Sequence, residues 1–387
     1  MKLLIRILAF GLTVPSALAQ ITPEAAVQAA LQSHPLMKAT ALDLQAKKYG
    51  EKAAFNLPNP EVNAESPTGE FYTVGVSQSF EFPTVYSRQK QVAKAETALA
   101  LAGQGVSEND LRHAVRSLYL EAQLAEYQVR QWTERDSLYQ AIATTAGRQF
   151  TGGEIDFLQK TLAENEAGQV HQERLAAEQM AGALRSQLAT FTGLADLGML
   201  LPLSADTVGL VAIPDVAINP SVTYERQVAE VAAQQVRLAQ SRMLPNFSLG
   251  YLNQGARSTP IDYRFRASVG LPLWLGQYRA GTNAAKAERE AAKARAEAQS
   301  QSIALELIRV RMEAATALGR VQYHQREALP RSRSLIAAAA RMRAAGQVDY
   351  ATFLRTLDQA YAIQREYAAQ VQSLNTAQLR LRYLSGN

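Results

Sequence analysis

The sequence predicts a mainly α-helical protein with a small β part, built from two copies of one structural unit. The first observation is a repeat, because Arg148–Gly193 returns as Arg341–Gly386 at a constant offset of 193 residues. The second is a pair of long helix-compatible runs, residues 84–150 and 278–345. The third is a pair of short alternating segments, one ahead of each run. Together they predict two internal repeats, each a β-hairpin followed by a helical hairpin.

The first residues have the pattern of a targeting segment. Lys2 and Arg6 precede an apolar run, Ile7–Val14, which is followed by the small-residue site Ala17-Leu18-Ala19. This predicts a secretory signal peptide over residues 1–19. The alternative, a membrane anchor, is disfavoured because a spanning helix needs roughly 20 apolar residues. The sequence contains no cysteine, so neither disulfides nor a lipid anchor on an N-terminal cysteine are expected.

The charge balance excludes several classes of function. Removing Lys2 and Arg6 lowers the net charge from +5 to +3, which is too mild to indicate a nucleic-acid partner. No phosphate loop, nucleophile elbow or paired-carboxylate motif is present, so we expect neither an enzyme nor a bound cofactor. The four histidines have no metal-ligand spacing and predict no metal site; they are His34, His113, His171 and His324.

The first repeat is predicted over residues 20–193. Thr22 caps a first helix, Pro35 separates it from a second helix ending near Phe55, and Leu57-Pro58-Asn59-Pro60 stops helix formation. A β-hairpin is expected over residues 60–82, because Phe71–Phe82 alternates between apolar and polar side chains. A helical hairpin follows over residues 84–193, turning at a segment we call the first tip, Thr151–Asp156.

The second repeat follows a linker at residues 194–220 and covers residues 221–387. A helix near Val222–Met243, a β-hairpin at 246–275 and a helical hairpin at 278–386 are expected, with a kink at Pro330. The hairpin turns at the second tip, Ala344–Asp349. In the returning helix Tyr350, Leu354, Leu357 and Tyr361 form the start of an apolar seam. The repeat offset is 187 at Leu57-Pro58-Asn59 and 192 at Ala93–Glu96.

Four amphipathic strands in one chain cannot close a membrane barrel, because the edge strands would keep unpaired N–H and C=O groups. Three chains would supply twelve strands, within the range of outer-membrane barrels. The lumen of such a barrel would carry Glu81, Arg264 and Arg266, and aromatic side chains would lie near the interfaces: Phe71, Tyr72, Phe80, Phe82, Tyr263 and Trp274. The alternative is a soluble sheet packed on the helices.

The order of these elements, given twice after a signal peptide, resembles the outer-membrane efflux proteins of the TolC family. The resemblance is carried by these short motifs: Val76–Glu81 followed by Arg88, Gly270–Trp274 followed by Arg279, and the two tips. The resemblance covers essentially the whole chain beyond the signal peptide, and the short length looks closest to the CzcC/CusC heavy-metal branch. It implies a trimeric channel in which a 12-stranded transmembrane β-barrel continues into a periplasmic α-helical coiled-coil barrel.

The resemblance also implies a function. Such a protein is a passive exit duct of a tripartite efflux pump in the outer membrane of a Gram-negative bacterium, as a homotrimer in outer-membrane lipid. Its partners are a periplasmic adaptor and an inner-membrane transporter, most often of the RND type. The cargo can be heavy-metal cations, drugs or polypeptides. The tip residues implied in adaptor docking are Gly152, Gly153, Glu154, Asp156, Gly346, Gln347 and Asp349.

Each candidate tip residue also has an ordinary structural role. Asp156 and Asp349 would cap the returning helices, and Gly153 and Gly346 would serve turn geometry. Six such carboxylates in a trimer could also favour cations at a narrow end. The sequence departs from the family where acidic gate residues are expected on the last helix, because Thr352 and Arg355 lie there.

Two other classes of protein compete with the duct. A periplasmic coiled-coil adaptor would have one helical hairpin between lipoyl and β-barrel segments, whereas two hairpins are predicted here. An exported hydrolase would need a catalytic constellation, and no such motif is found.

Overall fold

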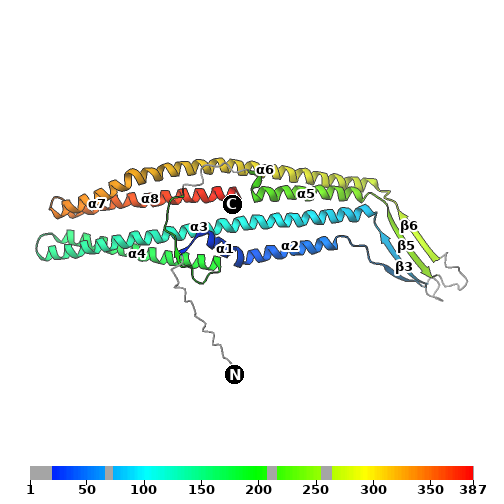
Figure 1. Ribbon diagram of the computed structural model, residues 1–387, viewed down its shortest axis with the longest axis horizontal. Coiled ribbons are helices and arrows are strands. Elements are labelled where there is room, and N and C mark those ends of the chain that lie inside the picture. Colours follow the sequence, from blue (N-terminus) through cyan, green and yellow to red (C-terminus); the bar gives the residue numbers. More distant parts are fainter. Residues whose placement is uncertain (1–19, 66–72, 207–215, 254–263, 387) are drawn as a thin grey trace, which may run out of the picture. The chain divides into compact units, whose positions relative to one another are not determined.

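A computed structural model describes residues 20–65, 73–206, 216–253 and 264–386 (Figure 1). The predicted signal peptide at 1–19 and part of each β-hairpin, including Phe71, Tyr72 and Tyr263, lie outside the described residues. The described elements are, in chain order, β1 (Gln20–Ile21), α1 (Pro23–Ser33), α2 (Pro35–Ala53), β2 (Glu61–Glu65), β3 (Thr73–Phe80), α3 (Pro83–Thr151), α4 (Phe157–Thr192), β4 (Met199–Leu200), a 3-10 turn (Val216–Ile218), α5 (Pro220–Ser241), β5 (Asn246–Asn253), β6 (Phe265–Gly270), α6 (Leu275–Tyr323), a π-helical turn (His324–Ala328), α7 (Leu329–Ala344) and α8 (Tyr350–Leu384).

The first long helix, α3, runs without interruption for 69 residues. At 1.5 Å per residue this corresponds to roughly 100 Å. Its sequence is dominated by Ala, Glu, Gln, Arg and Leu, which lose little side-chain freedom in a helix. The helix predicted over residues 84–150 is therefore confirmed, and α4 returns from its end as the other arm of a helical hairpin.

The second long helix is interrupted by the π-helical turn at His324–Ala328. Before this turn, Ala285–Glu288 corresponds to Ala93–Glu96 at an offset of 192 residues. After it, Arg341–Gly386 corresponds to Arg148–Gly193 at an offset of 193. Each π-type hydrogen bond spans one residue more than an α-helical one, so the turn accommodates a one-residue insertion. The irregularity was expected at Pro330 and lies in the turn before it, where the missing Pro330 N–H leaves the carbonyl of Arg326 without its helical donor.

Short polar side chains begin the N-terminal helices. Thr22 Oγ1 accepts a hydrogen bond from the N–H of Ala25 at 3.1 Å, as predicted. Pro35 starts α2, and His34 Nδ1 accepts from the N–H of Leu36 at 3.2 Å, a cap that the sequence did not predict. Asn219 plays the same part for α5, where its Oδ1 accepts from the N–H of Ser221 at 2.8 Å.

The four longer strands form one antiparallel sheet in the order β2-β3-β5-β6. The central pair joins the repeats, because β3 of the first pairs with β5 of the second, with Phe80 opposite Phe247. Within each predicted β-hairpin the described strands pair antiparallel, β2 with β3 and β5 with β6. This arrangement leaves β2 and β6 as the edge strands of the described sheet.

The sheet has one apolar and one polar face. The apolar face carries large exposed side chains, among them Val62 at 72% and Leu249 at 58% of full exposure. Register places these residues on that face: Val62, Val74, Val76, Phe80, Phe247, Leu249, Tyr251, Phe265 and Val269, with Gln78 and Asn253 as polar exceptions. Leu252 is an apolar exception on the opposite face. The other face carries Glu61, Asn63, Ser77, Ser79, Ser248, Arg266 and Ser268. The predicted alternation is thus confirmed in the described strands.

The chain divides into two compact units that cut across the repeats. One comprises residues 1–33, 114–205 and 320–375, and the other residues 34–113, 206–319 and 376–387. The core of the first unit joins α3, α4, α7 and α8 around Tyr139, Val170 and Leu357. The core of the second joins α5, α6 and α8 around Val222, Leu307 and Leu384. The predicted seam of α8 is confirmed, since Tyr350, Leu354, Leu357 and Tyr361 are all buried.

The linker holds a short strand that the sequence did not predict. β4 pairs in parallel with β1, with Gln20 opposite Met199 and Ile21 opposite Leu200. The hydroxyl of Tyr119 on α3 bridges the two segments, because it donates to the carbonyl of Ile21 at 2.6 Å and accepts from the N–H of Leu201 at 2.9 Å.

Candidate functional site

The two tips have the same backbone geometry. Gly153 and Gly346 have φ angles of 72° and 68°, in the left-handed region that favours glycine. Each ends its helix with the pair of hydrogen bonds that satisfies the last free carbonyls. In the first tip these are Gly153 N–H to Phe150 O (3.0 Å) and Glu154 N–H to Gln149 O (2.8 Å), and in the second Gly346 N–H to Arg343 O (3.0 Å) and Gln347 N–H to Met342 O (2.9 Å). All four donors and acceptors correspond at the offset of 193.

The two aspartates cap the returning helices, as predicted. Asp156 Oδ1 accepts from the N–H of Gln159 at 2.8 Å, and Asp349 Oδ1 accepts from the N–H of Thr352 at 2.7 Å. The Thr352 N–H, with smaller contributions from Arg355 and Arg343, lowers the pKa of Asp349 below its ordinary value. Capping accounts for both carboxylates without a gating role.

The side chains of the two tips differ. Phe157 at the start of α4 is 66% exposed, whereas the equivalent Tyr350 at the start of α8 is 2% exposed. Tyr350 is covered because the guanidinium of Arg343 stacks 3.9 Å from its ring centroid. Gln149 accepts from both Tyr350 and Arg343 and so ties the second tip to α3. The first tip therefore presents an aromatic surface that the second tip lacks.

The positions where the family resemblance implies acidic gate residues carry none. Thr352 donates its N–H to Asp349, and Arg355 is exposed. The next carboxylate along α8 is Asp358, which forms an exposed ion pair with Arg365 at 3.6 Å. The structure thus describes Arg355, a cation, on the turn where an anion was expected.

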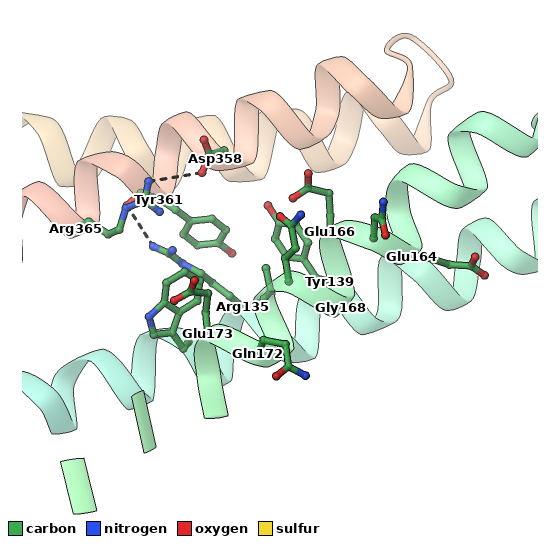
Figure 2. A pocket seen from close by; sticks show the side chains of 14 residues that line it. Arg135, Tyr139, Glu164, Glu166, Gly168, Gln172, Glu173, Asp358, Tyr361 and Arg365 are labelled. Carbon is green, nitrogen blue, oxygen red and sulfur yellow. Dashed lines mark hydrogen bonds and ion pairs between the residues drawn. The ribbon is translucent and has the colours of Figure 1, made fainter. Parts of the chain in front are cut away.

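A cavity of about 590 Å³ lies between α3, α4 and α8 in the first unit. Figure 2 shows Arg135 and Tyr139 of α3, the glutamates of α4 and Tyr361 and Arg365 of α8 around it. Its carboxylates are Glu164, Glu166, Glu173 and Asp358. The sequence does not predict this cavity, because its walls come from three helices far apart in the chain.

Arg135 is the unusual residue of this cavity. It is 3% exposed, and its guanidinium lies between the rings of Trp132 (4.7 Å) and Tyr361 (4.0 Å). It donates one hydrogen bond, to the carbonyl of Tyr361 at 3.2 Å, and Arg135 Nε is buried without an acceptor. Burial, with a smaller contribution from Arg365, lowers the pKa of Arg135 to about 10. The cation is held by aromatic faces rather than by a carboxylate.

The three residues predicted to face a lumen differ in placement. Arg266 lies within β6 opposite Gly250, on the polar face. Glu81 follows β3, and its N–H donates to the hydroxyl of Tyr86 at 2.9 Å. Arg264 precedes β6 and its Nη1 donates to the hydroxyl of Tyr251, a residue of the apolar face, at 3.4 Å. The alternation therefore does not extend to Arg264, and the lumen role of all three stays a prediction.

The histidines have individual contacts. His171 lies 3.0 Å from Asp136, which also accepts from Arg174, and the hydrogen bonds from both hold the pKa of Asp136 below its ordinary value despite burial. Among the described residues, no group of three His, Cys, Asp or Glu side chains is placed to hold a metal ion. In the same part of the chain, no helix has an apolar stretch long enough to cross a bilayer.

Comparison with known families finds one match. The family described as outer membrane efflux protein matches residues 217–387, which comprise the second repeat. No curated protein matches the sequence.

Solved structures match nearly the whole chain. CusC matches with a TM-score of 0.80 at 15% identity, covering 94% of this chain and 92% of that chain. The CmeC outer membrane channel of Campylobacter jejuni matches with 0.79 at 12% identity (94% and 85% covered), and the open MtrE channel of Neisseria gonorrhoeae with 0.74 at 14% (94% and 89%). These similar scores do not single out the heavy-metal branch. Residues 217–387 thus match the outer membrane efflux protein family, and the chain has the fold of TolC-like outer membrane channels.

Proposed function

We propose that this chain is the outer-membrane exit duct of a tripartite efflux pump, acting as a passive homotrimeric channel without enzymatic activity. Three copies would supply twelve strands for a transmembrane barrel, and their helices would form a tube continuous with it. The periplasmic adaptor would dock on the two tips, and the energy would come from an inner-membrane transporter of the RND type.

One observation carries this proposal: the exposed apolar face of the four-stranded sheet. Val76 and Leu249 lie on this face at 46% and 58% exposure, and in the β3-β5 pair Val76 lies opposite Tyr251 and Leu249 opposite Gln78. A contiguous apolar sheet face of this kind marks an interaction with lipid or with another protein. The open edges β2 and β6 add a second requirement, because lipid offers no partner for their backbone groups. Closure by further copies would satisfy both.

The runner-up, a periplasmic coiled-coil adaptor, is disfavoured by the same features. Two helical hairpins end in two tips, and one sheet draws two strands from each repeat. An adaptor with a single hairpin would have neither.

Membrane fractionation with chemical crosslinking tests the duct. We expect the mature chain in the outer-membrane fraction, and crosslinked species up to a trimer. A soluble monomer in the periplasmic fraction would rule the duct out.

The tips give a second test. Proline cannot adopt the positive φ of Gly153 or Gly346, and it removes the N–H that each glycine donates. Replacing both, Gly153→Pro with Gly346→Pro, should abolish efflux and leave trimers intact, as measured by drug or metal susceptibility and by native mass. Gly147→Ala is the matched control, because Gly147 lies outside the tips, has no positive φ, and a Cβ there would meet no atom within 4 Å. Loss of trimers in the proline variant would show that the glycines serve assembly rather than docking.

The cargo is the finer part of the proposal. Heavy-metal cations are the class suggested by the similarity to CusC, and organic compounds are the class to set against them. Deletion of the gene with measurement of sensitivity to both classes separates them. Sensitivity to organic compounds alone would exclude the heavy-metal assignment.

A further inference from the structure

A second cavity adjoins the cavity that Figure 2 shows. It has a volume of about 350 Å³ and lies between α3 and α8, with Glu173 contributed by α4. The two cavities share four lining residues, which are Trp132, Arg135, Glu173 and Arg365. All of these walls belong to the first compact unit of a single chain. The buried Arg135 therefore lies where the two cavities meet.

The Arg135 guanidinium has no counter-ion among the described residues. Charged groups that are buried in proteins are normally paired with an opposite charge. Arg135 instead lies between two aromatic rings and donates one hydrogen bond, to the carbonyl of Tyr361, and its Nε has no acceptor in the described chain. Arg365 lowers the pKa of Arg135 more than the carboxylate of Asp358 raises it. Because the rings cover the faces of the guanidinium, its N–H edge is the part that an anion can reach.

The two cavities differ in the charge of their walls. The first cavity carries four carboxylates against two arginines, and Figure 2 shows Arg135 and Arg365 at the same end of it. The second cavity sets the same two arginines against Glu173 alone. Its other polar walls are uncharged amides, which both donate and accept hydrogen bonds: Gln128, Gln131, Gln364 and Gln372. The excess of one positive charge favours a monoanion in the second cavity, whereas the carboxylates of the first cavity repel one.

Arg365 is available to share an anion with Arg135. Its ion pair with Asp358 joins a nitrogen and an oxygen at 3.6 Å, and the two side chains are 48% and 72% exposed. Exposed ion pairs of this kind contribute little to stability, so a better acceptor can displace Asp358. Arg135 and Arg365 therefore offer two guanidinium groups to one ligand.

The remaining walls of the second cavity are apolar or aromatic. They are Leu124, Tyr127, Trp132, Ala368 and Ala369. Burial in this environment raises the pKa of Tyr127. The volume of the cavity lies near the lower end of the range for small-molecule sites. Such walls favour an organic anion over an inorganic one, because only an organic body gains free energy from contact with apolar side chains.

We infer that the second cavity binds a monoanionic aromatic carboxylate, with its carboxylate between Arg135 and Arg365 and its ring against Tyr127. A carboxylate matches the guanidinium fork, because two parallel N–H groups donate to its two oxygens. The ligand supplies the counter-ion that Arg135 lacks and joins α3 to α8. Its site lies within one chain, so the inference does not depend on the number of copies in the assembly.

Tryptophan fluorescence gives a local test on the purified full-length protein. The sequence contains two tryptophans, of which Trp132 lines the cavity and Trp274, 79% exposed, does not. Trp274→Phe leaves Trp132 as the single tryptophan, so its emission reports on the site. Titration with benzoate should change this emission saturably at millimolar concentration or below. Benzamide, which has the same shape and no charge, should not.

Three further substitutions in this background assign the binding to the two arginines. Arg135→Met and Arg365→Gln should each weaken benzoate binding about 10- to 100-fold, the loss expected for a charge-assisted hydrogen bond. Arg355→Gln is the matched control, because Arg355 is an exposed arginine of α8 that lines neither cavity, and it should leave the affinity unchanged. The melting temperature of each variant verifies folding. Since Arg365 is 48% exposed, its variant keeps the test decisive if Arg135→Met fails to fold.

Saturable binding of benzoate that both cavity variants weaken and Arg355→Gln does not would support the inference. The inference is overturned by the absence of a saturable change, by equal binding of benzamide, or by an equal loss in Arg355→Gln. Inorganic phosphate that displaces benzoate at an equal concentration would overturn the aromatic carboxylate as the ligand class. None of these results depends on the proposed duct, which membrane fractionation tests separately.

Discussion

The Asp349 carboxylate at the second tip is expected to stabilise the fold in a way that depends on pH. Because the Thr352 N–H lowers its pKa in the folded state, the carboxylate stabilises the fold above the unfolded-state pKa of about 3.9, and this contribution disappears as the pH falls through the folded-state value. Asp349→Ala should therefore lower the melting temperature at pH 7, and the difference from the natural chain should shrink toward pH 3. Thermal unfolding across this range measures it.

Asp349→Asn is the matched control for this prediction. Asparagine caps helices about as well as aspartate but carries no charge, so its melting temperature should stay near that of the natural chain at pH 7. An equal deficit of Asp349→Ala at pH 7 and pH 3 would contradict the assigned pKa.

Arg135 gives the second prediction for a single residue. Burying a cation costs several kcal/mol, and two aromatic faces at about 2 kcal/mol each, with one hydrogen bond, offset that cost. Arg135→Met keeps the apolar contacts and removes the buried charge, so we expect a change in unfolding free energy below about 1 kcal/mol.

Arg135→Ala is the contrast, because truncating a large buried side chain typically costs about 2–5 kcal/mol. Denaturant unfolding of both variants tests the balance. If Arg135→Met proved as damaging as Arg135→Ala, the contacts with Trp132 and Tyr361 would outweigh desolvation.

These two residues also show what the sequence could predict at this scale. Asp156 and Asp349 were predicted as caps because a cap depends on the next three residues alone. Arg135 was missed because its burial depends on Tyr361, 226 positions away in the chain. The exposure of Phe157 but not of Tyr350 was missed for the same reason, since Arg343 and Gln149 cover only the second ring.

Among the elements, the π-helical turn at His324–Ala328 supports a sharp prediction. If it accommodates one inserted residue, deleting Gln325 should return this segment to the continuous α-helix of the first repeat and retain the fold. Deleting Ala315 from the regular part of α6 is the control. That deletion rotates every later residue of α6 by about 100°, so it misplaces the buried Ala317 and Val321.

The measurement is the yield of trimers and their melting temperature for the two deletions. Equal damage from both would show that the π-helical turn is required in its own right, for example as a hinge.

The elements were largely predictable because their signals are local and repeated. The long helices follow from composition, the strands from alternation and the breaks from Pro35 and Leu57-Pro58-Asn59-Pro60. The parallel pair β1-β4 was not predictable, because two-residue strands have no period and pair only through long-range packing on Tyr119. The early start of α6 at Leu275 shows the usual uncertainty of helix boundaries.

For the whole molecule, the repeat bears on how copies of the proposed duct would assemble. The junction of the first repeat with the second is formed within the chain, through α3-α5 and β3-β5. In the described sheet β6 of the second repeat and β2 of the first are the two edge strands, so they do not pair within the chain. The number of copies that closes the ring is not encoded in any local pattern, which is why the trimer comes from the family resemblance.

The exposed sheet face supplies the last prediction, which concerns the assembled molecule in its membrane. Leu249 and Ser248 are neighbours on β5 with opposite faces, so Leu249→Arg and Ser248→Arg form a matched pair. An arginine on the lipid face of a barrel costs about 2–4 kcal/mol near the bilayer midplane, whereas a lumen position is wet. Leu249→Arg should reduce the amount of trimer in the outer membrane, and Ser248→Arg should not. Quantifying heat-resistant trimer in purified outer membranes distinguishes them, and the reverse order of effects would mean that the polar face, not the apolar one, meets the lipid.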